Sequence, residues 1–256
     1  MKRYIDVSEW QGDIDFAKVK GSVDGIILRA GYGKGNADKK FDRNATECNR
    51  LGIPCGAYWF SYAKTAEEAK TEAMYLLKAV APYRMELPMA FDFEYDSVTN
   101  AKKAGVSVSK ALASNMVREF CNHIEAAGYW ALNYANPDFL NRYFDESVTK
   151  RYGLWLASWY NTVDVNKPPR ECAIWQWGGS TIPGIVGTVD TNESYTDFAK
   201  IIVEKGLNNI KKPSAENGIT KPNTKENAVK WAKEYGITDN EEIAVALFNY
   251  NNKFCN

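Results

Sequence analysis

The chain has 256 residues, of which 45% are hydrophobic and 13% aromatic. That is enough apolar material for one large core and a small appendage. Lys plus Arg and Asp plus Glu both number 32, so the formal net charge is zero. A balanced charge gives no electrostatic reason to expect binding to nucleic acid or to an anionic membrane.

The cysteines and the single histidine limit the kinds of metal site, disulfide and active site that the chain can form. The five cysteines, at positions 48, 55, 121, 172 and 255, are scattered and include no CxxC pair. They predict neither a disulfide framework nor a zinc site, so we expect reduced thiols, no metal and no cofactor. Because His123 is the single histidine, any Ser-His-Asp or Cys-His mechanism would depend on it. It falls near the end of a predicted helix, where a surface position is the simpler interpretation.

The N-terminal stretch MKRYIDVSEWQGDIDF begins with basic residues but lacks an apolar segment, so it does not predict a signal peptide. No apolar run approaches the ~20 residues needed to cross a bilayer. We expect a monomer that is either made in the cytoplasm and released, or secreted with its export signal removed.

Short apolar runs alternate with helical periodicity along the chain. Helices are predicted at residues 42–51, at 65–80 after the capping signal Thr65-x-x-Glu68, and at 110–127 before Gly128. The predicted strands are residues 4–7, 25–30, 55–62, 87–94, 129–134, 153–159, 172–177 and 185–190.

The order of these elements predicts an α/β fold. Near-continuous apolar strands separated by helices indicate a parallel sheet covered by helices. The last three strands follow residue 152 with connections too short for full helices, which favours an eight-stranded barrel over an open doubly wound sheet. Neither GxGxxG nor GxxxxGK[ST] occurs, so nucleotide binding is not predicted.

The composition changes at Gly206. Residues 206–222 are rich in Lys, Asn, Pro and Gly and predict a linker. Two short helices are predicted at residues 224–235 and 239–251. Such a hairpin is too small to hold its own core, so we divide the chain into a barrel (1–205), a linker (206–222) and a helical extension (223–256) packed on the barrel or on a partner.

The stretch MAFDFEYD, residues 89–96, places two carboxylates in a strand-like apolar run. Side chains alternate along a strand, so Asp92 and Glu94 should point the same way. Burial and mutual repulsion would raise the pKa of at least one of them. Asp6 in the first strand and Asp190 at the end of the eighth would lie beside each other in a closed barrel, facing this pair. Four acids around one cleft indicate a function.

Aromatic residues are predicted around the same rim. Acids together with exposed aromatic faces suit a sugar-binding cleft, because sugar C–H faces stack on rings while carboxylates hold hydroxyls. For any single ring, core packing is an equally good interpretation. The rim includes Trp10 and Trp155, and the predicted substrate-binding residues are Tyr58, Trp59, Tyr62, Tyr134, Trp159, Trp175 and Trp177.

A series of motifs resembles the lysozymes of glycoside hydrolase family 25. They are YIDVSEWQG (4–12), RAGYG (29–33), GIPCGAYWF (52–60), Asp92-x-Glu94, YAN (134–136), LWLA (154–157), WQW (175–177) and PGI (183–185) leading to VDTN (189–192). The resemblance implies an irregular TIM-like (β/α)5(β)3 barrel. It also implies hydrolysis, with retention, of the β-1,4 bond between N-acetylmuramic acid and N-acetylglucosamine in bacterial peptidoglycan.

The resemblance also implies roles for the acids. Glu94 matches the general acid, and Asp92 matches the nucleophile or the group that stabilises an intermediate formed by the substrate's acetamido group. Asp6 and Asp190 match two further acids of the cleft, and Tyr58 and Tyr134 match tyrosines that line it. Trp59 departs from the commonest pattern, which has histidine there. The residues themselves favour a protonated Glu94 beside an ionised Asp92.

Two alternatives use the same residues. One is a catalytically inactive barrel that only binds glycans, and the other is a hydrolase in which the acid cluster holds Mg²⁺ or Ca²⁺. The expected partner is the peptidoglycan strand, reached by release as in a phage endolysin or by secretion, and the helical extension is either wall-binding or structural.

Overall fold

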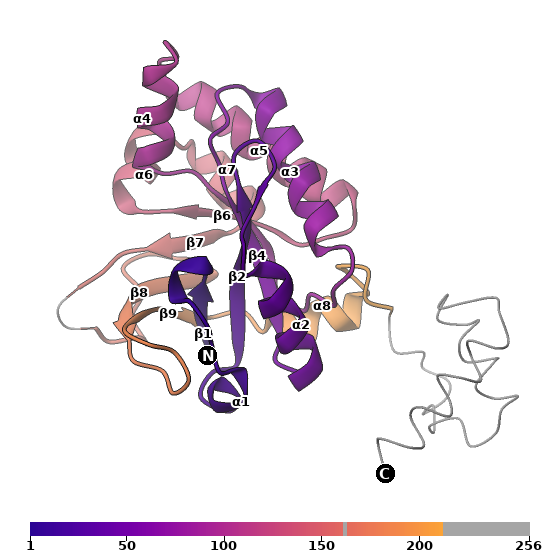
Figure 1. Ribbon diagram of the computed structural model, residues 1–256. Coiled ribbons are helices and arrows are strands. Elements are labelled where there is room, and N and C mark those ends of the chain that lie inside the picture. Colours follow the sequence, from indigo (N-terminus) through magenta and orange to yellow (C-terminus); the bar gives the residue numbers. More distant parts are fainter. Residues whose placement is uncertain (161–162, 212–256) are drawn as a thin grey trace, which may run out of the picture. The chain divides into compact units, whose positions relative to one another are not determined.

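The computed structural model describes residues 1–160 and 163–211 (Figure 1). The helical extension predicted at 223–256 and most of the predicted linker lie outside these residues. The strands are β1 (Lys2–Val7), β2 (Gly25–Tyr32), β3 (Asn36–Ala37), β4 (Cys55–Phe60), β5 (Met89–Asp92), β6 (Ala131–Ala135), β7 (Leu154–Ala157), β8 (Ile174–Ser180) and β9 (Val189–Ser194). The helices are α1 (Phe16–Val19), α2 (Phe41–Leu51), α3 (Ala66–Val80), α4 (Tyr95–Lys103), α5 (Lys110–Ala126), α6 (Pro137–Arg142), α7 (Glu146–Tyr152) and α8 (Phe198–Lys205).

Eight of the strands close into a barrel, which confirms the predicted fold. The order is β1-β2-β4-β5-β6-β7-β8-β9, and β1 pairs with both β2 and β9. The short β3 pairs only with the end of β2. All neighbouring strands from β1 to β8 are parallel, whereas β9 is antiparallel to both of its neighbours.

The last strand therefore differs from the prediction of a wholly parallel barrel. It spans Val189–Ser194 rather than 185–190 and runs antiparallel to β8, because the loop of residues 181–188 returns the chain directly to the neighbouring position in the sheet. Asp190 thus lies near the start of β9, not at the end of a strand. An antiparallel strand begins where its parallel neighbours end, so Asp190 still reaches the same mouth of the barrel.

Inside the barrel, apolar residues at the base are followed two positions later by polar residues at the mouth. The two sets share the inward face because side chains alternate along a strand. The lower residues form one buried cluster, and the upper ones line a cavity. The pairs are Tyr4 and Asp6, Ile27 and Arg29, Ala90 and Asp92, Leu132 and Tyr134, and Ile174 and Gln176.

The base of the barrel is closed by α8 and the residues after it. Phe198 and Ile202 of α8 join the buried interior cluster, as does Ile210. Asn208 is buried: its side chain donates to the carbonyls of Met85 (2.8 Å) and Leu87 (2.9 Å) and accepts from the Trp130 backbone N–H (2.8 Å). Residues 206–211, which were expected to begin the linker, therefore pack against the barrel.

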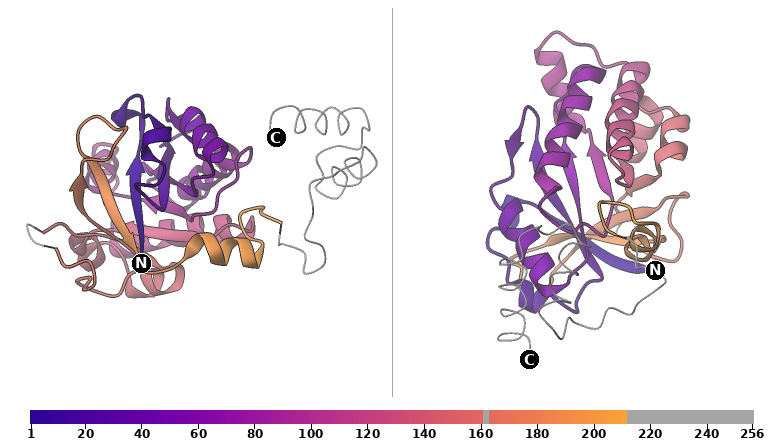
Figure 2. Two further views of the ribbon diagram at one scale, coloured as in Figure 1. Left: turned by 90° about the horizontal axis from the view of Figure 1, so that it is seen from below. Right: turned by 90° about the vertical axis from the view of Figure 1, so that its right-hand side faces the viewer.

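The helices cover the outer face of β2–β6, and β8 and β9 carry loops instead (Figures 1 and 2). The outward side chains of the strands and the inner faces of α2, α3 and α5 form the larger core cluster. Helix α3 begins where the Thr65 side chain accepts from the Glu68 N–H, and α2 ends at Gly52, whose left-handed φ of 67° suits glycine.

The four cysteines that the structure describes (Cys48, Cys55, Cys121 and Cys172) are free thiols, and the first three are buried. His123 lies in the last turn of α5. None of the described helices is both long and apolar enough to cross a bilayer.

Candidate active site

The MAFDFEYD stretch contains the junction of β5 with α4. The strand ends at Asp92, two residues earlier than predicted, and Glu94 is the N-cap of α4. Its backbone remains extended (φ −127°, ψ −170°), and its N–H donates to Ser97 Oγ (3.0 Å). The alternation of the strand therefore continues to Glu94, and the side chains of Asp92 and Glu94 share a hydrogen bond.

The aromatic residues of the same stretch face the other way. Phe91 and Phe93 are buried and stack with a centroid separation of 6.1 Å and an interplanar angle of 4°. Phe91 also packs on Phe120 of α5. This packing anchors the end of β5 from the outer face, so the two carboxylates are held in place toward the mouth of the barrel.

All four predicted acids line one cavity of about 230 Å³ at the mouth of the barrel. Asp6 and Asp190 are direct partners in the β1–β9 register, as expected from neighbouring strands. A larger cavity of about 500 Å³ lies at the other end of the barrel, where its one carboxylate, Glu125, is ion-paired with Arg151. The acid cluster therefore marks the smaller cavity as the candidate site.

Asp6 is buried and tightly held. Its Oδ2 accepts hydrogen bonds from Gln176 Nε2 (3.0 Å) and Asn192 Nδ2 (2.9 Å). Burial, followed by the nearby charge of Asp190, raises the pKa of Asp6 to about 7, although the two amide donors oppose the shift. Asp6 is therefore partly protonated near neutral pH.

Asp92 and Glu94 behave as a coupled pair. Burial and the charges of Glu94 and Asp6 raise the pKa of Asp92 well above its usual range. Burial also raises the pKa of Glu94, and Asp190 adds to this, whereas the hydrogen bond from Asp92 lowers it. Both carboxyls therefore have a raised pKa, in line with the expectation that burial and mutual repulsion raise at least one of them.

The predicted aromatic residues divide by strand face. Tyr58 and Tyr134 line the cavity, and Trp159, which is exposed, lies at its rim through a hydrogen bond to Gln176. Trp59 and Trp175 are buried in the core between the sheet and its covering elements, and Trp177 packs against that core. Tyr62 lies outside the cavity lining, where its hydroxyl donates to Asp96.

Comparison with known proteins places this site in a family. The sequence model of "Glycosyl hydrolases family 25" matches residues 5–185. The chain belongs to this family, and it is a glycoside hydrolase. Lysozyme M1 of Streptomyces globisporus is 24% identical over 226 residues, which cover 77% of this chain and 69% of that protein.

Two solved structures resemble this glycoside hydrolase. The autolysin LytC of Streptococcus pneumoniae, solved with a synthetic peptidoglycan ligand, is 28% identical with a TM-score of 0.63, covering 75% of this chain and 46% of that one. The lysozyme of Streptomyces coelicolor is 22% identical with a TM-score of 0.61, covering 82% and 98%. The second comparison shows a shared fold.

Gln176 is a site residue of this family 25 chain that the sequence analysis did not select. Its Oε1 accepts from the Tyr134 hydroxyl (3.0 Å) and from Trp159 Nε1 (3.2 Å), while its Nε2 donates to Asp6. It therefore connects an acid to two aromatic residues. The alternation of the WQW motif could have identified it, since a strand that turns both Trp175 and Trp177 outward turns Gln176 inward.

Arg29 and Asn192 were also not selected, whereas Trp155 was expected on the aromatic rim. Arg29 and Trp155 line the cavity, and Trp155 Nε1 donates to Asn192 Oδ1 (2.7 Å), which orients the amide that holds Asp6. Among the described residues, no group of three or more His, Cys, Asp or Glu side chains is arranged to hold a metal ion.

Proposed function

We propose that this chain is a lysozyme that hydrolyses the β-1,4 bond between N-acetylmuramic acid and N-acetylglucosamine with retention of configuration. The observation that carries the proposal is the hydrogen-bonded pair of Asp92 and Glu94 in a cavity with two further acids. Family membership supports the reaction class, and similarity to lysozyme M1 and to an autolysin solved with a peptidoglycan ligand supports the substrate.

Glu94 is the general acid in this proposal. Glycoside hydrolysis requires one protonated carboxyl to protonate the leaving oxygen and one carboxylate to face the developing positive charge. Glu94 is more exposed than Asp92 and begins α4, so it is better placed to reach the glycosidic oxygen. The raised pKa of Glu94 keeps its carboxyl protonated at a pH where a free glutamate would be ionised, and Asp92 is the carboxylate that faces the developing charge.

The contact between the two carboxyls supports retention. Inverting enzymes separate their carboxyls by about 6.5–9.5 Å so that a water molecule fits between them and the sugar. Two carboxyls joined by a hydrogen bond leave no such space. Asp92 then acts either as the nucleophile or by stabilising the intermediate formed by the acetamido group of the substrate.

Asp6 and Asp190 set the charge around the pair. The charge of Asp6 raises the pKa of Asp92, and that of Asp190 raises the pKa of Glu94. Both effects keep a proton on the pair at a pH where isolated carboxyls would have lost it.

The substrate-facing rings in this proposal are Tyr58, Tyr134 and Trp159. The enzyme would meet the wall after release from the cell, as an endolysin does, or after secretion.

Proton NMR of the sugar anomers during the first minutes of hydrolysis tests retention. Soluble glycan fragments should first yield the β-anomer, which then equilibrates. Initial α-anomer would contradict the proposed geometry. A matched substrate without N-acetyl groups separates the two roles of Asp92, since only the acetamido route requires that group. Full activity in EDTA is expected, and its loss would favour the metal-dependent alternative.

A further inference from the structure

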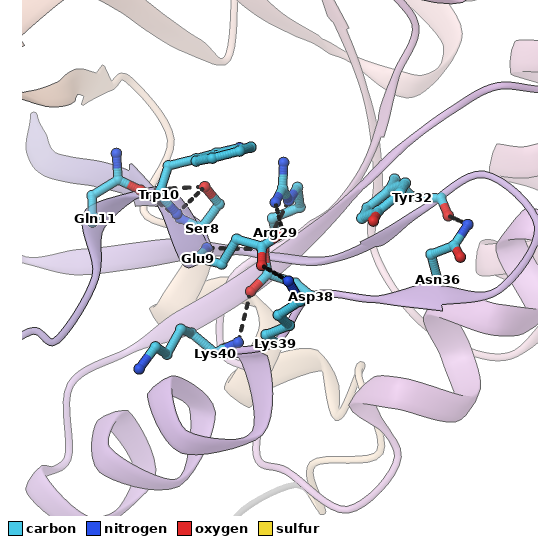
Figure 3. Close-up of polar contacts among 10 residues, drawn as sticks. All are labelled: Ser8, Glu9, Trp10, Gln11, Arg29, Tyr32, Asn36, Asp38, Lys39 and Lys40. Carbon is cyan, nitrogen blue, oxygen red and sulfur yellow. Dashed lines mark hydrogen bonds and ion pairs between the residues drawn. The ribbon is translucent and has the colours of Figure 1, made fainter.

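Trp10 has the most exposed side chain among the aromatic residues that the structure describes, at 80%. It lies in the 3-10 turn Glu9–Gln11 between β1 and α1, and it lines the cavity that holds the four acids. In Figure 3 its ring extends from the turn on the side away from Asp38 and Lys40. Aromatic side chains commonly line ligand pockets, so a ring that lines the cavity and stays open to water is available to contact a ligand there.

The turn that carries Trp10 is closed by its own hydrogen bonds. The Trp10 N–H donates to Ser8 Oγ (3.2 Å), and the Ser8 N–H donates to Gln11 Oε1 (2.7 Å). The Ser8 and Gln11 side chains, each accepting from the other residue's backbone, form a capping box around the turn. The backbone of Trp10 is therefore fixed relative to β1, four residues after Asp6.

A buried cluster of charges, which we call the Glu9 clamp (Glu9, Arg29 and Asp38), fixes the turn to the barrel. Asp38 Oδ2 accepts from the Glu9 N–H (2.9 Å) and from Arg29 Nε (2.8 Å), and Arg29 Nη2 donates to Glu9 Oε1 (3.0 Å). The side chain of Asp38 is fully buried, and those of Arg29 and Glu9 are 11% and 16% exposed. Figure 3 shows these contacts between β2, the turn and the segment before α2.

The clamp is electrically balanced. Lys39 Nζ lies 3.6 Å from Glu9 Oε2, so two carboxylates meet two cations. Arg29 is therefore occupied by protein carboxylates and is not a free site for an anion. Buried ion pairs contribute little net stability because of their desolvation cost, so a positioning role explains this clamp better than a stabilising one.

We propose that Trp10 binds substrate by stacking on a sugar ring of the glycan strand outside the cavity, and that the Glu9 clamp positions it there. This inference rests on the proposed function. The cavity of about 230 Å³ is smaller than the ~300–1,000 Å³ of pockets that enclose a drug-sized ligand, so further sugars of a strand must lie over its rim. Trp10 offers them a solvent-exposed ring on a backbone that the turn and the clamp hold in place.

Binding of glycan fragments tests the role of Trp10. In the Glu94→Gln background, dissociation constants are measured for peptide-free oligosaccharides of alternating N-acetylglucosamine and N-acetylmuramic acid, at several lengths. Trp10→Ala should raise Kd about tenfold for long fragments, the size of an interaction worth about 1.4 kcal/mol. The effect should vanish for the disaccharide, and Trp10→Phe should restore most of the affinity. Tyr75→Ala, which removes a partly exposed ring from α3, should leave Kd unchanged.

A double-mutant cycle tests the clamp. Glu9→Gln removes the ion pairs while preserving its backbone N–H, and it should raise Kd about threefold when Trp10 is present. In the Trp10→Ala background the same substitution should have no effect on Kd, since the clamp acts through that ring. A clamp that only stabilises the fold would lower Tm without moving Kd in either background.

The two proposals fail differently. If the wild type releases no sugars from peptidoglycan, the proposed function is wrong. If the wild type is active but Trp10→Ala binds long fragments as tightly as the parent, the proposed stacking of Trp10 on a sugar ring is wrong. An equal loss of affinity from Glu9→Gln in both backgrounds would contradict positioning through Trp10. In the active enzyme, Trp10→Ala should raise KM on peptidoglycan and change kcat less than about twofold.

Discussion

The carboxylates in this cleft have different hydrogen-bond donors, and this difference affects their pKa values. Asp6 accepts two amide hydrogen bonds, whereas Asp92 has a buried Oδ1 to which no N–H or hydroxyl of the described residues donates. A buried carboxyl oxygen without such a donor favours a proton on the group. The missing donor therefore acts in the same direction as burial, which raises the pKa of Asp92.

Asp190→Asn tests how the charges set the activity profile. Removing the negative charge of Asp190 lowers the pKa of Glu94, because that charge raises it. The general acid then loses its proton at a lower pH, so the alkaline limb of kcat/KM should move to lower pH. The ratio of variant to wild-type kcat/KM should be smaller at pH 7 than at pH 5, measured on soluble glycan fragments. A limb that moves to higher pH would contradict the assignment of Glu94.

The neighbours that raise these pKa values could be predicted only in part from the sequence. The MAFDFEYD stretch indicated that two carboxylates share a face and that at least one pKa is raised, and the structure agrees. The shifts also depend on the burial of each carboxyl and on Asp6 and Asp190, which come from strands far away in the chain. Spacing along one strand contains no information about either.

At the scale of elements, alternation along each strand decides which aromatic residues reach the cleft. Tyr58 and Trp59 are consecutive in β4, so they cannot both face inward. The sequence contained this information, yet the prediction of a single aromatic rim placed both there. The same rule applied to the WQW motif separates Gln176 from its two tryptophans. The alternation of inward and outward side chains along each strand therefore predicts which residues reach the cleft better than the aromatic content of a motif does.

Helix α3 contains a buried carboxylate outside the cleft, that of Glu72, which contacts the connection from β4. Its Oε1 accepts from the Tyr62 N–H (2.9 Å), its Oε2 has no partner among the described residues, and burial raises its pKa to about 7. A raised pKa means that the folded state binds the proton more tightly. The stability that this proton contributes is complete below pH 4 and is lost as the pH rises to about 7.

Glu72→Gln should therefore stabilise the protein at pH 8. The substitution removes the buried charge and preserves the acceptor for Tyr62, so the free energy of unfolding at pH 8 should rise by a few kcal/mol. At pH 4.5 the two proteins should differ much less. Chemical unfolding followed by fluorescence at both pH values measures this. A gain that is the same at both would show that the charge of Glu72 is not its cause.

At the scale of the whole molecule, closure of the barrel explains both what could be predicted and what could not. Asp6 and Asp190 were expected to lie together because the first and last strands of a closed barrel must meet, and they do. The direction of β9 was not predictable from hydrophobic pattern, because alternation is the same whichever way a strand runs. Either direction brings Asp190 to the mouth if the strand is displaced by a few residues.

The base of the barrel shows where composition misled the prediction. Residues 206–211 include Gly206, Asn208 and Asn209, which are typical of a linker, but Asn208 is buried with three hydrogen bonds. Asn208 and Asn209 have left-handed backbones (φ 55° and 57°), a conformation that asparagine tolerates. The polar composition here satisfies backbone groups at the base of β5 and β6.

Asn208→Ala should destabilise the whole barrel. It leaves the carbonyls of Met85 and Leu87 and the N–H of Trp130 without this partner, and each buried unsatisfied group costs about 1–3 kcal/mol. We expect a loss of at least about 2 kcal/mol in the free energy of unfolding, with kcat unchanged in the folded enzyme. Asn209→Ala, with a hydrogen bond only to the Tyr129 hydroxyl, is the matched control and should cost less. Equal losses would contradict the role of Asn208.

The central claim is that the carboxyl pair of a family 25 barrel cleaves peptidoglycan on the reducing side of N-acetylmuramic acid. Mass spectrometry of borohydride-reduced products from purified peptidoglycan tests it most directly, with wild type and Glu94→Gln compared at equal concentration. Reduced muramic acid ends from the wild type alone are predicted. Reduced glucosamine ends, or equal muramic acid ends from Glu94→Gln, would contradict the account.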